Sequence, residues 1–394
     1  MKVLIVGAGI AGCTLALALD KAGLESHIVE ARPGVDTGGA FLALAPNGVN
    51  ALRTLDLGGI PETAGGFVLS GLDFRNAKGR RIAQLDGEQD EARYGAPSIL
   101  LQRARLQREL ASRVSAAGIR TDFDTRVLDV VQDAAGVTAT LDAGDTVRAD
   151  ALVGADGIFS TIRQLAWPEA QPPRYTGIID CGGWTDVDLP ETARQQMHFG
   201  REAFFGHAIR NGTAYWFSNF PRSQEPERAE LDRIEGPAWM SQLRALHAAD
   251  PAPIPGILAA ATDSAGAWPI YDLPDPDEWS TSRICLIGDA AHAMSPSAGQ
   301  GASLAIEDGV VLAQSLRDHN DPSPALERFV QARKPRAEKI VKFGRQIGER
   351  KISSAASNVV RDLGLPLFLR MGARATADQY GYSVEWDADA HTSL

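Results

Sequence analysis

The distribution of apolar and polar positions predicts that the chain opens with a β-α-β unit. Residues 3–6 form a short apolar, largely β-branched run, which is typical of a strand buried on both faces of a parallel sheet. Apolar residues then recur with helical spacing over 10–22, and the pattern stops near Gly23. A second strand is predicted over 26–29, directly before Glu30.

Periodicity further along the chain predicts two more kinds of element. Residues 103–117 have the spacing of an amphipathic helix that stops at Gly118. Three short segments separated by polar or glycine turns predict a small antiparallel meander, over 126–132, 137–141 and 146–149.

Aromatic residues are concentrated in the middle of the chain. Alternating segments such as 203–209 and 213–219 predict an antiparallel sheet there, whereas the pattern beyond about residue 300 is helical. We therefore predict an α/β protein, with a Rossmann-like βαβ domain, an interleaved antiparallel-sheet domain and C-terminal helices. The predicted boundaries are 1–70, 98–172 and 275–345 for the βαβ domain, 71–97 and 173–274 for the sheet domain, and 346–394 for the C-terminal helical segment.

Composition narrows the class of protein. The 394 residues carry a net charge of −11, which argues against nucleic acid or an anionic membrane as the main partner. The three cysteines are widely spaced, so they do not suggest a disulfide framework, and no stretch approaches the roughly 20 apolar residues that span a bilayer. We expect a soluble, cytoplasmic protein, and no spacing of ligands suggests a metal site.

A glycine-rich turn follows the first predicted strand and opens the first predicted helix. In GAGIAG, Gly7 permits a tight turn, Gly9 lets the backbone approach a pyrophosphate, and Gly12 allows the helix to pack closely on the strand. Glu30 lies 18 residues after Gly12, close to the spacing expected of a carboxylate that binds a ribose 2′-hydroxyl. An ordinary tight turn would explain the glycines alone, but strand, helix and acid together predict dinucleotide binding.

Two later segments carry a resemblance to a known family. ALVGADGIFSTIR (151–163) and RICLIGDAAHAMSPSAGQGASLAIEDGVVLAQ (283–314) are similar to the DG and GD motifs of the group A, aromatic-hydroxylase-type FAD-dependent monooxygenases. That group includes salicylate-, kynurenine- and tetracycline-hydroxylase-like enzymes, and the resemblance extends from residue 1 to about 345. It implies non-covalent FAD, with the candidate cofactor-binding residues Gly7, Gly9, Ala11, Gly12, Glu30, Arg32, Ala43, Arg103, Val127, Asp156, Gly288, Asp289, Gly301, Ala302 and Ser303.

The resemblance also implies roles for some of these residues. Arg103 would reach the FAD diphosphate, because a guanidinium presents a rigid fork of donors, and Asp289 would accept a hydrogen bond from the ribityl chain. The helix that starts near Ala302 would face the isoalloxazine pyrimidine. The family often has Asn where this chain has Ser303, and for Asp156 a turn that merely positions a helix is the alternative.

Catalytic and substrate-binding residues are less clearly indicated. His292 and His207 are weak catalytic candidates, and the alternatives are a turn-holding histidine and a sheet histidine, respectively. Alternation cannot tell which face of each strand points into a pocket. The candidate substrate contacts are Trp184, His198, Phe205, His207, Trp216 and Pro296.

The resemblance implies hydroxylation of an aromatic or polycyclic small molecule with NAD(P)H and dioxygen, by way of a flavin hydroperoxide. No second GxGxxG motif occurs, so NAD(P)H is expected to be a transient co-substrate. Two alternatives stay open: an epoxidase or Baeyer–Villiger-type oxygenase, and a flavin-retaining protein that binds a pathway intermediate without turnover. The substrate, the choice between NADH and NADPH, and the choice between monomer and homodimer also stay open.

Overall fold

The computed structural model confirms the β-α-β unit at the N-terminus. β1 (Lys2–Val6) and β2 (Glu25–Val29) pair in parallel and are joined by α1 (Ile10–Lys21). Together with β8 (Arg120–Asp122), β12 (Ala151–Gly154) and β18 (Ile284–Leu286), they form a five-stranded parallel sheet in the order β18-β12-β1-β2-β8. The structure describes residues 1–35, 41–227, 236–261, 266–274, 276, 278–294, 299–348 and 355–387.

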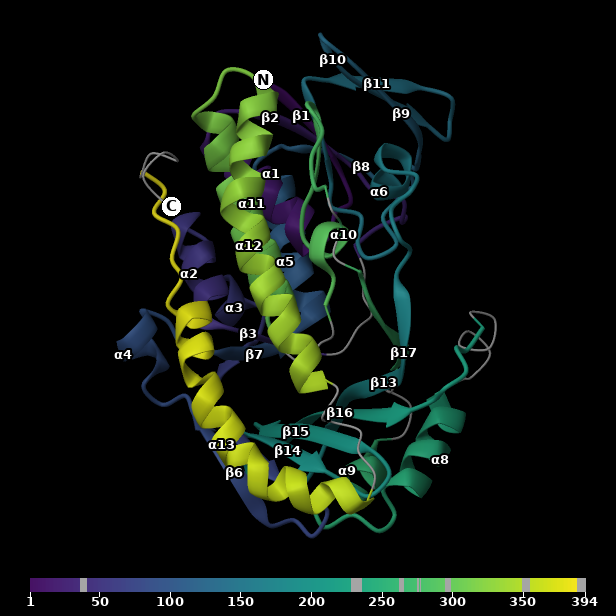
Figure 1. Ribbon diagram of the computed structural model, residues 1–394, viewed down its shortest axis with the longest axis vertical. Helices are drawn as coiled ribbons and strands as arrows, with labels where there is room; N and C mark the ends of the chain where they lie inside the picture. Colours follow the sequence, from purple (N-terminus) through teal and green to yellow (C-terminus); the bar gives the residue numbers. More distant parts are fainter. Residues whose placement is uncertain are drawn as a thin grey trace.

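Long helices cover this sheet. α1 packs between α5 (Arg103–Ala116) and α11 (Gly301–Arg317), and α11 also packs against α12 (Pro322–Gly348), which runs beside it in Figure 1. The packing of α1 on α11 is close, because a Cβ on Gly309 would lie 2.8 Å from the backbone nitrogen of Leu15. The predicted meander is also present, as β9 (Val127–Asp133), β10 (Gly136–Leu141) and β11 (Thr146–Ala149).

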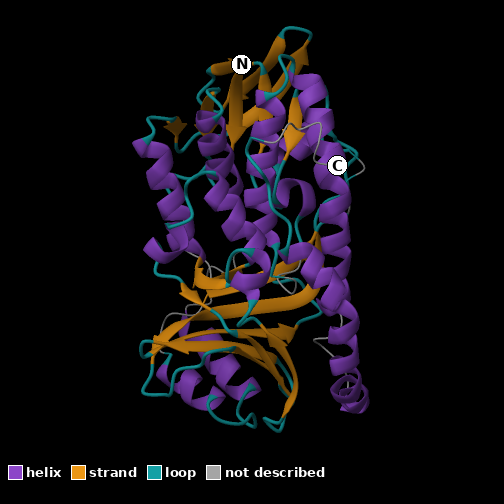
Figure 2. Cartoon of the chain, turned by 90° about the vertical axis from the view of Figure 1, so that its left-hand side faces the viewer, coloured by secondary structure: helices purple, strands orange, loops and turns teal. Residues whose placement is uncertain are grey.

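A larger sheet lies below the long helices (Figure 2). Its seven strands have the order β17-β13-β16-β15-β14-β5-β6. The sheet is mixed rather than antiparallel throughout, because β5 and β14 pair in parallel. β5 comes from far upstream in the chain and forms its own hairpin with β6, so the later hairpins do not set its direction. The strands are β5 (Gly71–Arg75), β6 (Arg81–Asp86), β13 (Arg174–Asp186), β14 (Gln195–Phe199), β15 (Phe204–Arg210), β16 (Thr213–Pro221) and β17 (Gly266–Asp272).

The two faces of the large sheet have different partners. α8 (Gly236–Leu246) and α9 (Ile254–Ala260) cover one face, where Phe205, Trp216 and their neighbours form a separate buried core. The other face looks toward the parallel sheet and lines a cavity with side chains that include Phe204 and Phe217. Strand alternation thus sends adjacent residues of one strand to two different environments.

Further elements complete the fold. The sequence pattern did not predict the small sheet of β3 (Phe41–Leu44), β7 (Ile99–Gln102) and β4 (Phe67–Val68). The C-terminal helix α13 (Ala355–Tyr380) runs from the large sheet toward the long helices (Figure 1), where it contacts α2 (Pro46–Thr54). The remaining helices are α3 (Ile60–Thr63), α4 (Asp90–Tyr94), α6 (Thr161–Ala166) and α10 (Asp289–His292). Within the described ranges, none of the helices has the length and apolar character needed to cross a membrane.

Candidate functional site

A cavity of about 1830 Å³ lies between the parallel sheet, the large sheet and α13. Most of the predicted cofactor-binding residues line it. They are Gly7, Gly9, Ala11, Glu30, Arg32, Ala43, Arg103, Val127, Asp156, Asp289, Gly301 and Ala302. Gly12, Gly288 and Ser303 lie behind this lining. The structure therefore brings residues from eight separated parts of the sequence to one surface, and their contact with FAD stays a prediction.

The glycines of the first turn have different surroundings. Gly7 has a φ of 108°, and a Cβ there would lie 2.5 Å from the carbonyl oxygen of Ala155. A Cβ on Gly12 would lie 2.0 Å from the carbonyl oxygen of Gly7, whereas a Cβ on Gly9 would meet no protein atom within 4 Å. Gly7 and Gly12 thus allow the backbone to pack closely, and Gly9 leaves the cavity edge bare, as the approach of a pyrophosphate requires.

Glu30 directly follows β2 at the edge of the same cavity. Its Oε2 accepts a hydrogen bond from the backbone N–H of Ala8 (2.7 Å), and its Oε1 accepts one from the N–H of Arg32 (2.9 Å). The carboxylate is therefore held in one orientation beside the glycine turn. This position suits a group that accepts a hydrogen bond from a ribose hydroxyl.

α5 contributes a second contact with the glycine turn. Arg103 begins the helix at the cavity wall, and Gln107, one turn later, donates through Nε2 to the carbonyl oxygen of Ala8 (3.0 Å). Gln107 Oε1 is buried and has no hydrogen-bond partner, so a ligand that carries a hydroxyl group would satisfy it. Sequence reasoning missed Gln107, although its spacing of four residues from Arg103 indicates the same helix face.

The N-terminus of α11 forms another part of the cavity wall. Gly299, Gln300, Gly301 and Ala302 line the cavity there, and the 17-residue helix directs its positive dipole end toward it. Asp289, the first residue of α10, is an exposed carboxylate on the same wall. The helix N-terminus fits the negative charge expected of a reduced flavin pyrimidine, and the Asp289 carboxylate fits as an acceptor for the hydroxyls of a ribityl chain.

Two side chains near this turn make contacts that the sequence did not indicate. Ser303 is fully buried and its Oγ accepts a hydrogen bond from the N–H of Ala45 (3.2 Å), so its side chain holds the end of β3 and does not reach the cavity. Gln300, which sequence reasoning missed, lines the cavity. Its Oε1 accepts a hydrogen bond from Asn47 (3.0 Å), whereas its Nε2 is buried without a partner.

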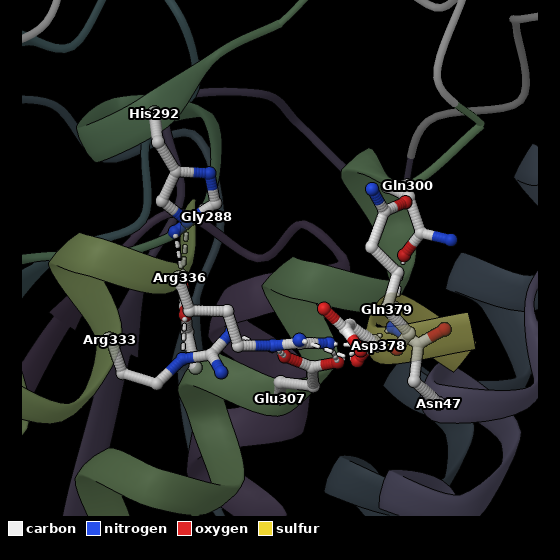
Figure 3. Close-up of polar contacts among 10 residues, drawn as sticks. Asn47, Gly288, His292, Gln300, Glu307, Arg333, Arg336, Asp378 and Gln379 are labelled. Atoms are coloured by element: carbon white, nitrogen blue, oxygen red, sulfur yellow. Dashed lines mark hydrogen bonds and ion pairs between the residues drawn. The ribbon is translucent and has the colours of Figure 1, made fainter. Parts of the chain in front are cut away.

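A buried network of charges supports the turns at Gly288 and Gln300 from behind (Figure 3). Asp308 accepts hydrogen bonds from the N–H of Gly288 (2.9 Å), from His292 Nε2 (2.6 Å) and from Arg333 Nε (2.8 Å). Burial alone would raise the pKa of Asp308, but His292 and Arg333 outweigh it and lower that pKa. His292 does not line the cavity; its contact with Asp308 gives it the turn-holding role that was the alternative to catalysis.

Glu307 extends the same network toward α2 and α13. It forms ion pairs with Arg333 (2.6 Å) and Arg336 (2.8 Å), and it accepts a hydrogen bond from Asn47 (2.6 Å). Arg336 also donates to the carbonyl oxygen of Gln379 (3.0 Å), and Figure 3 shows these groups converging between the helices. The network therefore ties the turn that holds Gln300 to the end of α13.

Asp156 is positioned by the segment that follows β12. Its Oδ1 accepts a hydrogen bond from Ser160 Oγ (2.6 Å) and its Oδ2 accepts one from the N–H of Ile162 (3.1 Å). Burial raises the pKa of Asp156. These contacts match the alternative in which Asp156 positions a helix. The buried Arg163 then donates to the carbonyl oxygen of Ala290 (2.7 Å), which ties the DG segment to the GD segment.

The predicted substrate contacts lie outside the cavity lining. His198, Phe205, His207 and Trp216 are buried on the face of the large sheet that α8 and α9 cover. Trp184 pairs with Tyr215 on the cavity side of the sheet but beyond the lining, and Pro296 lies outside the described residues. The physical reason is the phase of alternation: in β14, β15 and β16 the neighbours of the chosen residues face the cavity. Those lining side chains are Met197, Phe199, Phe204, Phe217 and Asn219.

The two histidines of the covered face form a stacked pair. Their ring centroids lie 5.4 Å apart, and burial lowers the pKa of His198 to about 4 and that of His207 to about 3. Both rings are therefore neutral near pH 7, and His207 is not placed for proton transfer in the cavity. No group of His, Cys, Asp and Glu side chains suited to a metal ion occurs in the part of the chain that the structure describes.

Comparison with known proteins agrees with this site. The family model described as FAD binding domain matches residues 1–344. The aurachin C monooxygenase/isomerase of Stigmatella aurantiaca is 32% identical over 354 residues, which cover 89% of each chain. A 3-amino-4-hydroxybenzoate 2-monooxygenase of Streptomyces platensis is 30% identical over 395 residues, which cover 98% of this chain and 96% of that protein.

Solved structures show the same architecture. Klebsiella pneumoniae HpxO, solved in complex with FAD and uric acid, superposes with a TM-score of 0.84 at 25% identity, over 96% of each chain. A salicylate hydroxylase substrate complex superposes with a TM-score of 0.80 at 22% identity, over 100% of this chain and 98% of the other, and this likeness concerns the fold alone.

Proposed function

The chain belongs to the FAD-binding-domain family and is an FAD-dependent monooxygenase, and we propose that it hydroxylates an aromatic or polycyclic small molecule with NAD(P)H and dioxygen. The observation that carries the proposal is the continuity of one cavity. It joins the glycine turn and the α11 N-terminus to a sheet face lined by Phe204 and Phe217. A nucleotide site and an aromatic-lined chamber thus share one space.

Different residues along the cavity would bind different parts of the cofactor. Gly9 and Arg103 would hold the diphosphate, Glu30 the adenosine ribose, and Asp289 the ribityl chain. The α11 N-terminus would stabilise negative charge at the pyrimidine edge. Bound FAD supplies the redox chemistry, in which NAD(P)H provides electrons and dioxygen is activated.

The sheet side of the cavity contributes the environment for the reaction. Phe199, Phe204 and Phe217 form an apolar wall, to which α13 adds Leu365 and Phe368. Such a wall excludes water, which would otherwise divert activated oxygen to hydrogen peroxide. It also matches a planar, weakly polar substrate, because aromatic rings favour edge-to-face and offset contacts. Two relatives are consistent with such a substrate. One is named a 3-amino-4-hydroxybenzoate 2-monooxygenase, and another was solved in complex with uric acid.

Oxygen labelling tests the reaction. The FAD-loaded protein is incubated with a panel of aromatic compounds, and those that stimulate NAD(P)H oxidation are repeated under ¹⁸O₂. We expect one labelled oxygen atom in a hydroxylated product. Labelled epoxide or ester products would favour the alternative oxygenases, and FAD-loaded protein that binds aromatics without consuming NAD(P)H or dioxygen would favour a binding protein.

The cellular setting is part of the proposal. The three cysteines are buried free thiols, which suits the reducing environment of the cytoplasm. A monomer or a homodimer is expected, and analytical ultracentrifugation of the FAD-loaded chain distinguishes the two.

A further inference from the structure

The substrate side of the cavity follows one face of α13 over much of its length. The lining residues of this helix recur every three or four positions, as Leu365, Phe368, Gly372, Thr376 and Tyr380. A helix rises 1.5 Å per residue, so the distance from Leu365 to Tyr380 is about 22 Å. The chamber is therefore much longer than a single aromatic ring.

The end of the chamber near Leu365 is apolar. Phe199 lies between Phe74 and Phe204, with ring centroids 6.3 Å and 5.1 Å away, respectively. Arg361 lies over the ring of Phe199, but it is already paired with Asp362 (2.8 Å). Phe74, Phe199 and Phe204 thus form a box of aromatic side chains at this end. The charge of Arg361 beside it is compensated by Asp362.

The end near Tyr380 is polar and acidic. Asp90, the first residue of α4, lines the cavity and is 6% exposed. Ser98 Oγ donates a hydrogen bond to Asp90 Oδ2 (3.1 Å). The ring of Tyr380 packs edge-on against Tyr94, with the centroids 5.7 Å apart, so α4 and the end of α13 enclose this carboxyl group.

Asp90 differs from Asp86 because no described basic side chain is close enough to form an ion pair with it, and the charge of Arg93 acts on it only from a longer distance. Asp86 pairs with Arg194 (3.0 Å), and Arg93 donates to Gln89 (2.7 Å). No ion pair joins Asp90 to a basic side chain among the residues that the structure describes. Burial raises the pKa of Asp90, and burial together with the charge of Asp90 raises the pKa of Tyr380 to about 12.

A buried carboxyl without a counter-ion is costly, and in a binding cavity that cost is offset when a ligand supplies a donor. We propose that Asp90 determines specificity by accepting a hydrogen bond from an N–H group of the substrate. The substrate class is then an elongated aromatic amine whose apolar substituent occupies the box around Phe199. This inference rests on the proposed function, since it concerns the substrate of the same cavity.

Three probes of matched length, each long enough to extend from Asp90 toward the box around Phe199, test this inference: 4-decylaniline, 4-decyltoluene and 4-decylbenzoate. Their dissociation constants for the FAD-loaded protein at pH 7.5 are measured from changes in flavin absorbance. A hydrogen bond to a charged group is worth about 1.5–3 kcal/mol, so the amine should bind about tenfold or more tightly than the toluene. The benzoate should bind more weakly still, because two carboxylates repel each other.

Variants of α4 show whether Asp90 causes this preference. In Asp90→Asn, and in Asp90→Leu, the preference for amine over benzoate should fall at least about tenfold, with FAD content and melting temperature retained. Glu91→Gln is the matched control, because it removes the adjacent exposed charge from the same short helix and should leave the preference unchanged.

Three results overturn the inference: equal ratios in the parent protein and Asp90→Asn, a preference for the benzoate, or no binding of any probe. None of them affects the proposed function, which depends on NAD(P)H-dependent oxygenation of some aromatic compound. Conversely, absence of such turnover would contradict the proposed function, while the binding ratios would still test Asp90.

Discussion

The nucleotide half and the large-sheet half of this molecule form the cavity wall with different parts of the chain. Around the parallel sheet much of the wall is backbone, at the bare turn of Gly9 and at the N-terminus of α11. On the large sheet it is formed by side chains, and Phe204 and Phe217 face the cavity while Phe205 and Trp216 face the other way. The first half therefore depends on close backbone packing, and the second on the phase of two strands.

The two halves also bury polar groups differently. Beneath α11, charges are buried as compensated partners, with Arg333 between Glu307 and Asp308. Beneath the large sheet, His198 and His207 are buried as neutral rings. We therefore predict that removing one charged partner strongly lowers the stability of the first region. Lowering the pH should instead destabilise the second.

The largest effect is expected at the glycine turn. Gly12→Val should cost about 5 kcal/mol of unfolding free energy or prevent folding, because a Cβ would lie 2.0 Å from the carbonyl oxygen of Gly7. Gly9→Ala is the matched control, since its Cβ meets no protein atom within 4 Å. It should keep the stability of the FAD-free protein and weaken FAD binding. Urea unfolding measures the stability of each variant, and FAD titration measures its affinity for the cofactor. A Gly12→Val variant as stable as the parent protein would contradict the close packing of the turn.

The next effect concerns the buried charges. Arg333→Met should cost about 3–5 kcal/mol, because it leaves two buried carboxylates with fewer partners. Lys334→Met, at a partly exposed position one residue later, should cost less than about 1 kcal/mol. Equal unfolding midpoints for the two variants in urea would show that the network does not stabilise the fold.

Adjacent residues of β16 give the third test. Trp216→Ala should cost about 3–5 kcal/mol of stability, because the ring is fully buried beneath the sheet. Phe217→Ala should cost less stability and should instead weaken binding of aromatic compounds, because its ring lines the cavity. The pair is compared by thermal unfolding and by flavin absorbance titration. The reverse pattern would mean that the strand phase is wrong.

The smallest effect is a dependence on pH. The pKa values of His198 and His207, about 4 and 3, lie below the ordinary 6.5, so the unfolded state binds protons first as pH falls. Stability should therefore decrease from about pH 6.5 downward, by about 2 kcal/mol per histidine at pH 5. His207→Gln should reduce this decrease between pH 7 and 5, whereas His319→Gln, at a half-buried position in the connection between α11 and α12, should not. If His207→Gln and the parent protein lose stability identically as the pH falls, the two histidines are not a neutral buried pair.

The same contrast explains what the sequence could predict. The β1-α1-β2 unit, the meander and the helix over 103–116 follow from apolar periodicity, and Gly7, Gly9 and Glu30 are visible because their roles need particular residue types. These segments lie apart in the chain, and the structure brings them together at one cavity.

The remainder depends on tertiary contacts. His207 and Phe205 satisfy the same alternation as Phe204, and only the packing of α8 and α9 decides which face is covered. The parallel pairing of β5 with β14 joins distant segments, so no local pattern specifies it. Asp90 also had no local signal, because its burial results from the approach of α13.

The central claim, that FAD occupies the cavity of this chain, is tested most directly by cofactor stoichiometry. The purified protein is denatured with heat or acid, and the released flavin is quantified by absorbance against protein concentration. We predict a yellow protein that releases about one FAD per chain, because one cavity carries the phosphate turn and the flavin-facing helix. A colourless protein that takes up no added FAD would contradict the account.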